Sequence, residues 1–264
     1  ELHKAGRTQE AAPLFDQAAV AYLALVESNP ESSDADKALF NAAVAYEKSM
    51  RFESATGIYE QVWQKYQASE LAGEALWRSA ENYKRFFEFK KAVDSYLIMA
   101  DAPRFAGDPH RVDALYNAAA ILENDQDYGR AAQLFLRYAA QVGKPQEAAE
   151  SYFRAGMIYG KMGSFDQMAK VLREFPRLYG AVPGQQMRAV EAVYRIAKNA
   201  ETRGIAATAS KYYKLTIQEY KQRGLQPASD GAEYAAAATF QQLEGRLAEF
   251  LTAHPAVEIV HYPG

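Results

Sequence analysis

Aromatic residues recur along this chain at nearly constant intervals. Successive members of the series stand 37, 37, 39 and 37 residues apart: Phe15, Phe52, Phe89, Tyr128 and Phe165. A small or flexible residue follows each one three positions later, and a bulky residue follows four positions after that, as Ala55 and Tyr59 follow Phe52. Because residues three and four apart share one face of a helix, the pattern predicts a helix at each aromatic residue. A period of this length predicts a stack of helical hairpins.

A second helix is predicted in front of each aromatic position. Nine residues before that position stands a small residue in every period: Gly6, Ala43, Ala80, Ala119, Gly156 and, in a sixth period, Ala197. A small residue there allows the two helices of a hairpin to approach closely. Each period is therefore predicted to hold a helix A, a turn, a helix B and a junction. The predicted units lie near residues 1–35, 36–72, 73–111, 112–148, 149–189 and 190–227.

The positions of the prolines support this register, because proline ends or kinks a helix. Six of them fall in or beside the predicted junctions: Pro30, Pro103, Pro109, Pro145, Pro183 and Pro227. Pro13 is expected in the first turn of a helix B, just before Phe15, where proline is tolerated. We therefore expect no proline inside a helix.

Both ends of the predicted array depart from the pattern. The sixth unit has Ala206 at the aromatic position, 41 residues after Phe165. The first unit begins inside its helix A, so we expect the chain to be a section of a longer protein. Ser229 and Asp230 can cap a last helix, predicted over 228–254. Its apolar stripe is expected to cover the final hairpin and consists of Phe240, Leu243, Leu247 and Phe250. Residues 255–264 are expected to form a tail or to begin a further segment.

The order of small and aromatic positions resembles the tetratricopeptide repeat. Most of the middle units carry a small residue and then Tyr in helix A, such as Ala43 and Tyr46, followed by aromatic-x2-Ala-x3-aromatic in helix B. The exceptions are Leu122 at the Tyr position and Met168 and Leu172 in the fifth unit. The resemblance covers residues 1 to about 223 in about six units. It implies an all-α fold, a right-handed α-solenoid of tetratricopeptide-like hairpins closed by a C-terminal capping helix. It also implies a non-catalytic scaffold for protein interactions.

Composition removes several classes of function. A net charge of −3 over 264 residues gives no electrostatic reason to expect nucleic acid or an anionic membrane surface as partner. No run approaches the roughly 18 apolar residues of a membrane span, so direct membrane insertion is not expected. With zero cysteines, the chain can form no disulfide, thiolate zinc site or thiol nucleophile.

Candidate catalytic and metal-binding groups are few. The four histidines lack metal-ligand spacing and are predicted to be solvated at unit edges and in the tail: His3, His110, His254 and His261. Residues 124–127 (Asn-Asp-Gln-Asp) lack the Gly and the downstream Glu of a calcium loop and are predicted to form a turn. P-loop, Rossmann, nucleophile-elbow and H-E-x-x-H motifs are absent from the sequence. We therefore predict no enzyme activity, no cofactor and no metal.

The resemblance implies a binding surface, since helices A line the concave groove of tetratricopeptide stacks. One position expected to face the groove is aromatic in five units: Phe40, Trp77, Tyr116, Phe153 and Tyr194. The next position is polar: Asn41, Arg78, Asn117, Arg154 and Arg195. These ten residues are the candidates for contact with a peptide or helix of a partner, and Trp77 is the best single one.

A structural interpretation of the same residues stands beside the functional one. The rings can instead pack against the neighbouring hairpin. The arginines can form surface ion pairs with glutamates four residues earlier, namely Glu74, Glu150 and Glu191. Lys37 and Asn41 match part of the carboxylate clamp of co-chaperone tetratricopeptide domains, but the spacing of the other candidates breaks that pattern, and we assign no clamp.

The junctions are similar in style to those of bacterial envelope proteins. Residues 27–34 and 65–69, each followed by an Ala-rich helix, resemble the BamD-type and CpoB-type tetratricopeptide proteins. This implies a periplasmic scaffold that docks envelope or outer-membrane assembly components. A cytoplasmic regulatory or co-chaperone module is the alternative, and a self-assembling array whose ends stack is a third. A signal peptide or lipid-attachment site upstream would separate the first two.

Overall fold

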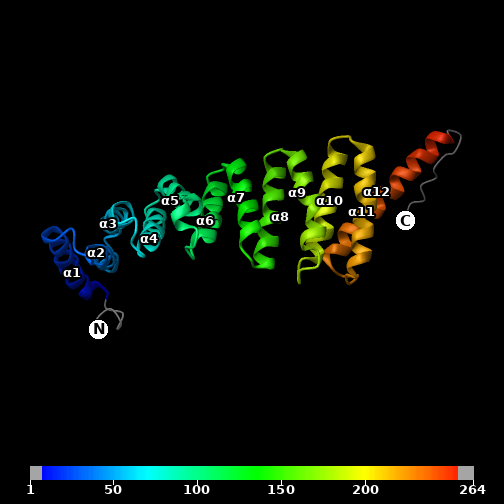
Figure 1. Cartoon of the computed structure of the whole chain (residues 1–264). Helices are drawn as coiled ribbons and strands as arrows, with labels where there is room; N and C mark the ends of the chain where they lie inside the picture. The colour runs from blue at the N-terminus through cyan, green and yellow to red at the C-terminus, as the bar shows by residue number, and fades with distance from the viewer. Residues whose placement is uncertain (1–7, 255–264) are drawn as a thin grey trace. The chain divides into compact units, whose positions relative to one another are not determined.

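The computed structural model describes residues 8–254, and these residues form α-helices, one 3-10 helix and no strand. The helices divide into two compact units, with the boundary between Asp127 and Tyr128 (Figure 1). The boundary falls inside the fourth unit predicted from the sequence. The predicted all-helical class is confirmed.

The first unit contains six α-helices, and each packs on the next along the chain. They are α1 (Thr8–Ser28), α2 (Ala35–Lys48), α3 (Phe52–Lys65), α4 (Ala72–Arg85), α5 (Phe89–Asp101) and α6 (Arg111–Asn124), with the 3-10 helix η1 (Pro103–Phe105) between the last two. Two of the predicted aromatic positions, Phe52 and Phe89, begin a helix. The hairpins α2–α3 and α4–α5 thus follow the predicted order of helix A and helix B.

The second unit also contains six α-helices packed in chain order. They are α7 (Tyr128–Gln141), α8 (Pro145–Lys161), α9 (Phe165–Tyr179), α10 (Gln186–Thr202), α11 (Ala206–Arg223) and α12 (Asp230–Ala253). Helix α11 begins at Ala206, where the aromatic residue of the repeat is missing. The sixth sequence repeat therefore forms its hairpin, α10–α11, without that side chain. Helix α12 packs on both α10 and α11.

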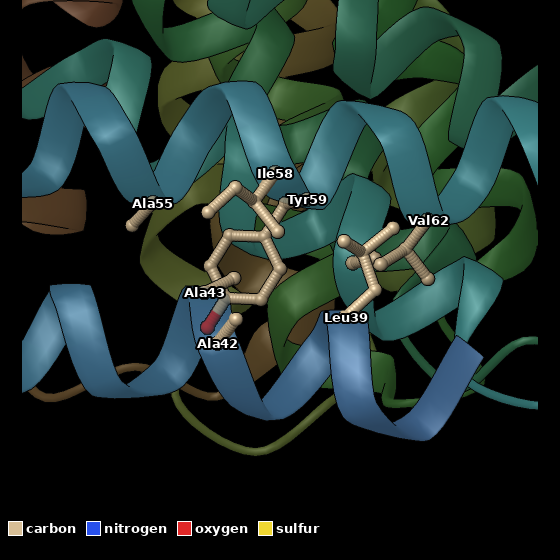
Figure 2. Close-up of a cluster of buried hydrophobic side chains, with 8 residues drawn as sticks. Leu39, Ala42, Ala43, Ala55, Ile58, Tyr59 and Val62 are labelled. Atoms are coloured by element: carbon tan, nitrogen blue, oxygen red, sulfur yellow. The ribbon is translucent and has the colours of Figure 1, made fainter. Parts of the chain in front are cut away.

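Small residues on helix A let large residues of helix B fill the hairpin core. In the α2–α3 hairpin the ring of Tyr59 lies beside Ala42 and Ala43, and all three are fully buried (Figure 2). Gly156 of α8 has the same role, since a methyl group on it would lie 2.5 Å from a methyl carbon of Leu172. The requirement for a small residue at this position is therefore steric.

In five of the sequence repeats, a residue with left-handed backbone follows the end of helix A at the same position. These residues are Met50, Phe87, Gln126, Gly163 and Gly204, with φ between 62° and 75°. In the first such turn the Arg51 N–H donates to the Tyr46 carbonyl, 2.8 Å away, which is the bond of a Schellman motif. Glycine adopts this conformation without strain, whereas Met50 and Phe87 do so at a cost of about 1–2 kcal/mol.

Two prolines contradict the expectation that none lies inside a helix. Helix α1 runs unbroken from Thr8 to Ser28 with Pro13 within it, so the turn expected just before Phe15 is absent. Pro176 lies inside α9, which continues to Tyr179. Each proline lacks the N–H that would bond to the carbonyl four residues earlier. Both helices nevertheless continue beyond the proline.

The orientation predicted for the last helix is wrong. Its stripe of large apolar residues faces solvent, with exposed fractions of 48–58% at Phe240, Leu243, Leu247 and Phe250. The buried residues of α12 are instead Gly231, Ala235 and Ala238. Small residues permit the closer approach to α10 and α11, so they outcompete the larger stripe for that contact. Residues 255–264, expected to form a tail or further segment, lie outside the described residues.

Candidate functional site

The aromatic candidates sit on helices A and rest edge-on against rings of helix B. In the first unit, Phe40 of α2 meets Tyr59 with ring centroids 5.3 Å apart, and Trp77 of α4 meets Tyr96 at 5.4 Å. Both pairs cross at about 60°, a favourable edge-to-face arrangement. Phe40 and Trp77 therefore have a structural role in addition to any contact with a partner, and both remain half-exposed.

Trp77 also has a partner from the following junction. The imidazole of His110 stacks on the indole with centroids 4.5 Å apart and an interplanar angle of 11°. Its Nε2 atom lies 3.0 Å from a carboxylate oxygen of Glu74, which fixes the imidazole over the indole. The expectation that His110 is merely solvated is wrong. Sequence spacing alone does not place a junction residue over a helix of the preceding hairpin.

Tyr116 of α6 is the most exposed ring among the candidates, with 38% of its surface accessible. The residue after it, Asn117, donates a hydrogen bond from Nδ2 to Glu81 of α4 over 3.5 Å. The hydroxyl of Tyr96 also donates to Glu81. Burial and this hydrogen bond raise the pKa of Tyr96, so the phenol stays protonated at neutral pH.

An arginine links helices A of consecutive hairpins in the first unit. Arg78 of α4 lies 2.8 Å from Glu47 of α2 and 2.6 Å from Glu74 of its own helix, and its guanidinium sits 5.8 Å above the Phe40 ring. Burial, the largest single influence, opposes the charge of Glu74, but the hydrogen bonds and charges of Arg78 and His110 together outweigh it and lower the pKa of Glu74. The ion pair between Glu74 and Arg78, predicted from their spacing, is present.

The second unit repeats this arrangement with other residues. Phe153 of α8 meets Phe175 at 5.3 Å, and Arg188 of α10 lies 5.8 Å above the Phe153 ring. Arg188 also approaches Glu150 of α8 at 3.7 Å. Arg188 was not predicted, because it lies seven residues before Arg195, outside the matched repeat position.

The remaining candidates of the second unit contact several helices. Tyr194 of α10 lies between Tyr213 of α11, at 5.9 Å, and Tyr234 of α12, at 5.1 Å. Arg195 donates from Nε to Glu191 over 2.6 Å, as its spacing predicts. The guanidinium of Arg154 lies 4.6 Å above the ring of Phe135.

We name the half-exposed surface of the first unit the A-helix face and define it by Phe40, Asn41, Trp77, Arg78, Tyr116 and Asn117. Contacts of Arg78, His110 and Asn117 join α2, α4 and α6 along this face. Asn41 is exposed there. The face offers aromatic edges, fixed charges and amides, which suit recognition of a polypeptide.

Groups for other chemistry are missing from the described part of the chain. Within residues 8–254, no cluster of His, Asp or Glu could hold a metal ion. Over the same range, no helix combines the length and apolar character needed to cross a membrane. Two histidines named in the sequence analysis, His3 and His261, lie outside the described residues.

The family model of the tetratricopeptide repeat matches residues 37–69 and 150–180, which span most of α2–α3 and α8–α9. Among curated proteins, none matches the chain.

Several solved structures are similar to this chain. The C-terminal part of a repeat-containing protein from Cytophaga hutchinsonii is 15% identical, with 92% of each chain covered and a TM-score of 0.45. A tetratricopeptide protein from Parabacteroides merdae is 14% identical, with 90% of this chain and 94% of that chain covered and a TM-score of 0.41. YrrB, described as having an unusual peptide-binding site, is 17% identical, with 83% and 99% covered and a TM-score of 0.41.

The two matched segments are tetratricopeptide repeats, as their order of small and aromatic residues predicts. Such repeats generally serve as scaffolds for protein interactions.

Proposed function

We propose that this chain is a non-catalytic scaffold that binds a peptide or helix of a partner on its A-helix face. The observation that carries the proposal is the set of half-exposed rings held in place on α2, α4 and α6. Trp77 lies between Tyr96 and His110, and Arg78 is fixed by two glutamates. Side chains that are already immobilised lose little entropy when a ligand binds.

The chemistry of the face defines the ligand class. Aromatic edges accept apolar side chains, while the exposed Asn41 can bond to a peptide backbone. Glu47, Glu74 and Glu81 lie along the face with Arg78 and outnumber it, so the face carries both signs of charge with an acidic excess. An amphipathic peptide with mixed charge fits this surface better than a polyanion does.

A display library of random peptides provides a test with a defined probe. Peptides selected on the 264-residue chain are then measured by calorimetry against Tyr116→Ala, with Phe89→Ala as the control. Phe89 is a similarly exposed ring, at 44% against 38%, but it lies on helix B α5. We expect Tyr116→Ala to weaken binding about tenfold or more, close to 1.4 kcal/mol, and Phe89→Ala to leave it unchanged.

The outcomes separate the possible surfaces. Equal binding by wild type and Tyr116→Ala, with loss in Phe89→Ala, would place the ligand on the helix B side and overturn the proposal. Trp77→Ala is a second variant, used only if circular dichroism shows intact helices, because the indole also packs on Tyr96.

We further propose a periplasmic location within a larger bacterial envelope protein that docks outer-membrane assembly components. The similarity of junctions 27–34 and 65–69 to BamD-type and CpoB-type proteins supports this, and the lack of cysteine is compatible with an oxidising compartment. Sequencing the upstream reading frame tests it. A signal peptide or lipid-attachment motif supports the envelope role, and a frame without one favours the cytoplasmic co-chaperone alternative.

A further inference from the structure

Helix α12 presents an apolar seam to solvent. The seam consists of Phe240, Leu243, Leu247 and Phe250, which follow one another at intervals of three, four and three residues. About half of each side chain surface is accessible. This spacing places the four residues at the a and d positions of a heptad, the pattern by which one helix packs along another.

The C-terminal half of α12 contains no buried residue, and His254 stacks on the Phe250 ring with centroids 4.4 Å apart. The buried residues of α12, Gly231, Ala235 and Ala238, all lie in the first half, and the amide of Gln242 donates to the Ser210 carbonyl of α11 over 3.1 Å. Every residue from 243 to 250 is exposed. Figure 1 shows this part of α12, in red, extending beyond α11. The seam is therefore not the surface by which α12 packs in its own unit.

We propose that two copies of this chain associate by pairing their α12 seams in parallel. Large residues make up the whole seam. A second α12 matches it, because Phe then meets Phe and Leu meets Leu in register.

The charges beside the seam select the parallel orientation. At about 100° per residue, Glu244 lies about 80° to one side of the centre of the seam and Arg246 about 80° to the other. In a parallel two-fold pair the acidic flank of one helix faces the basic flank of its partner. An antiparallel pair would instead set like charges together. Within the described residues, neither Glu244 nor Arg246 forms an ion pair.

The small size of the seam predicts a weak dimer. Stable interfaces involve roughly 20–30 residues on each side, and this seam supplies four large side chains per copy. We therefore expect reversible association that depends on protein concentration. The proposal goes beyond binding at the A-helix face, which lies in the other unit, and does not depend on it.

Sedimentation of the 264-residue chain over a wide concentration range tests the pairing. Wild type is expected to shift from monomer to dimer, and the double variant Leu243→Ser with Leu247→Ser is expected to weaken dimerisation about tenfold or more. Folding should persist, because both residues are exposed. The control is Leu14→Ser with Leu25→Ser on α1, where each leucine is 57% exposed, as is Leu243.

Two results would overturn this pairing. Wild type that stays monomeric at the highest concentration excludes it. A dimer that survives the α12 variant but is lost in the α1 variant assigns the contact to the other end of the chain.

The absence of native cysteine allows the orientation to be tested by disulfide formation. In a parallel pair, Phe250→Cys alone is expected to form a covalent dimer under mild oxidation. Formation of the mixed disulfide between Phe240→Cys and Phe250→Cys, in preference to either homodimer, would show an antiparallel pair and contradict the proposed orientation. Monomer-only oxidation products in both experiments contradict the seam contact itself.

Discussion

Helices α1 and α3 carry the same helix B pattern, yet they bury it differently. Tyr59 and Val62 of α3 are fully buried, whereas their equivalents in α1, Tyr22 and Leu25, are 37% and 57% exposed. Helix α3 packs on both α2 and α4, while α1, among the described helices, packs mainly on α2. The repeat pattern thus specifies which residues can form a core, and a packed helix A on each side determines whether they do.

The largest difference between the two helices is expected on removing the central tyrosine. Tyr59→Ala should lower the free energy of unfolding by about 3–5 kcal/mol, because it leaves a large cavity beside Ala42 and Ala43. Tyr22→Ala should cost less than about 1 kcal/mol, since water already reaches that side chain. Urea denaturation of both variants measures the difference. Similar losses would show that the exposed face of α1 is covered in solution.

A pair of glycines sharpens the steric part of the comparison. Gly156→Ala should destabilise the protein by about 1–3 kcal/mol, because the new methyl group would press on Leu172. Gly57→Ala is the matched control in α3, where the added methyl group meets nothing within 4 Å. It should raise stability by up to about 1 kcal/mol through helix propensity. A neutral Gly156→Ala would mean that the hairpin relaxes easily.

The fold was predictable because one pattern recurs. Spacing from Phe52 to Phe89 and the small residues Ala43 and Ala80 specify helix starts and close contacts within each hairpin. Pro13 and Pro176 were misjudged because a proline can remove one backbone hydrogen bond without ending the helix. The last helix was misjudged because amphipathic spacing identifies an apolar stripe without saying which neighbour it meets.

The candidate surface was predictable only in part. The repeat position of Phe40, Trp77 and Tyr116 correctly placed them on the helices A of three successive repeats. It did not reveal His110 on Trp77, since the path of a junction depends on η1 and on local turns. The bond between Arg78 and Glu47 joins residues 31 apart, and no local spacing rule connects them.

A smaller change in stability is expected when ion pairs are broken. The comparison is between a partly buried pair, Arg78 with Glu74, and an exposed pair, Lys37 with Asp34. The folded-state pKa of Glu74 is lowered, so its contribution to stability is present above the unfolded pKa of about 4.3 and is lost as pH falls through the folded value. Arg78→Met removes the part of this contribution that comes from Arg78 and leaves the part from His110. We expect a loss of about 1 kcal/mol or less at neutral pH.

The difference from wild type should shrink below about pH 4, and urea denaturation between pH 3 and 7 measures it. Lys37→Met, which breaks an exposed 2.8 Å pair with Asp34, should change little at any pH. A constant difference for Arg78→Met across the range would show that lost packing on Phe40, and not the ion pair, sets its effect.

Substitutions in the turns that follow helix A are expected to change the stability of the protein least. Phe87→Gly should raise stability by about 0.5–1 kcal/mol, because it relieves a left-handed backbone at a side chain that is 78% exposed. Gly163→Ala, at the same place in the second unit, should lower stability by a similar amount. Thermal melts resolve these changes. A loss of stability in Phe87→Gly would show that its ring contact with Phe89 matters more than the backbone strain.

Hydrogen–deuterium exchange with a selected peptide at saturation tests the A-helix face most directly. Slowed exchange is expected in α2, α4 and α6, which carry the half-exposed rings, with α3 and α5 unchanged. Protection confined to α3 and α5, or to α12, would contradict binding at the A-helix face.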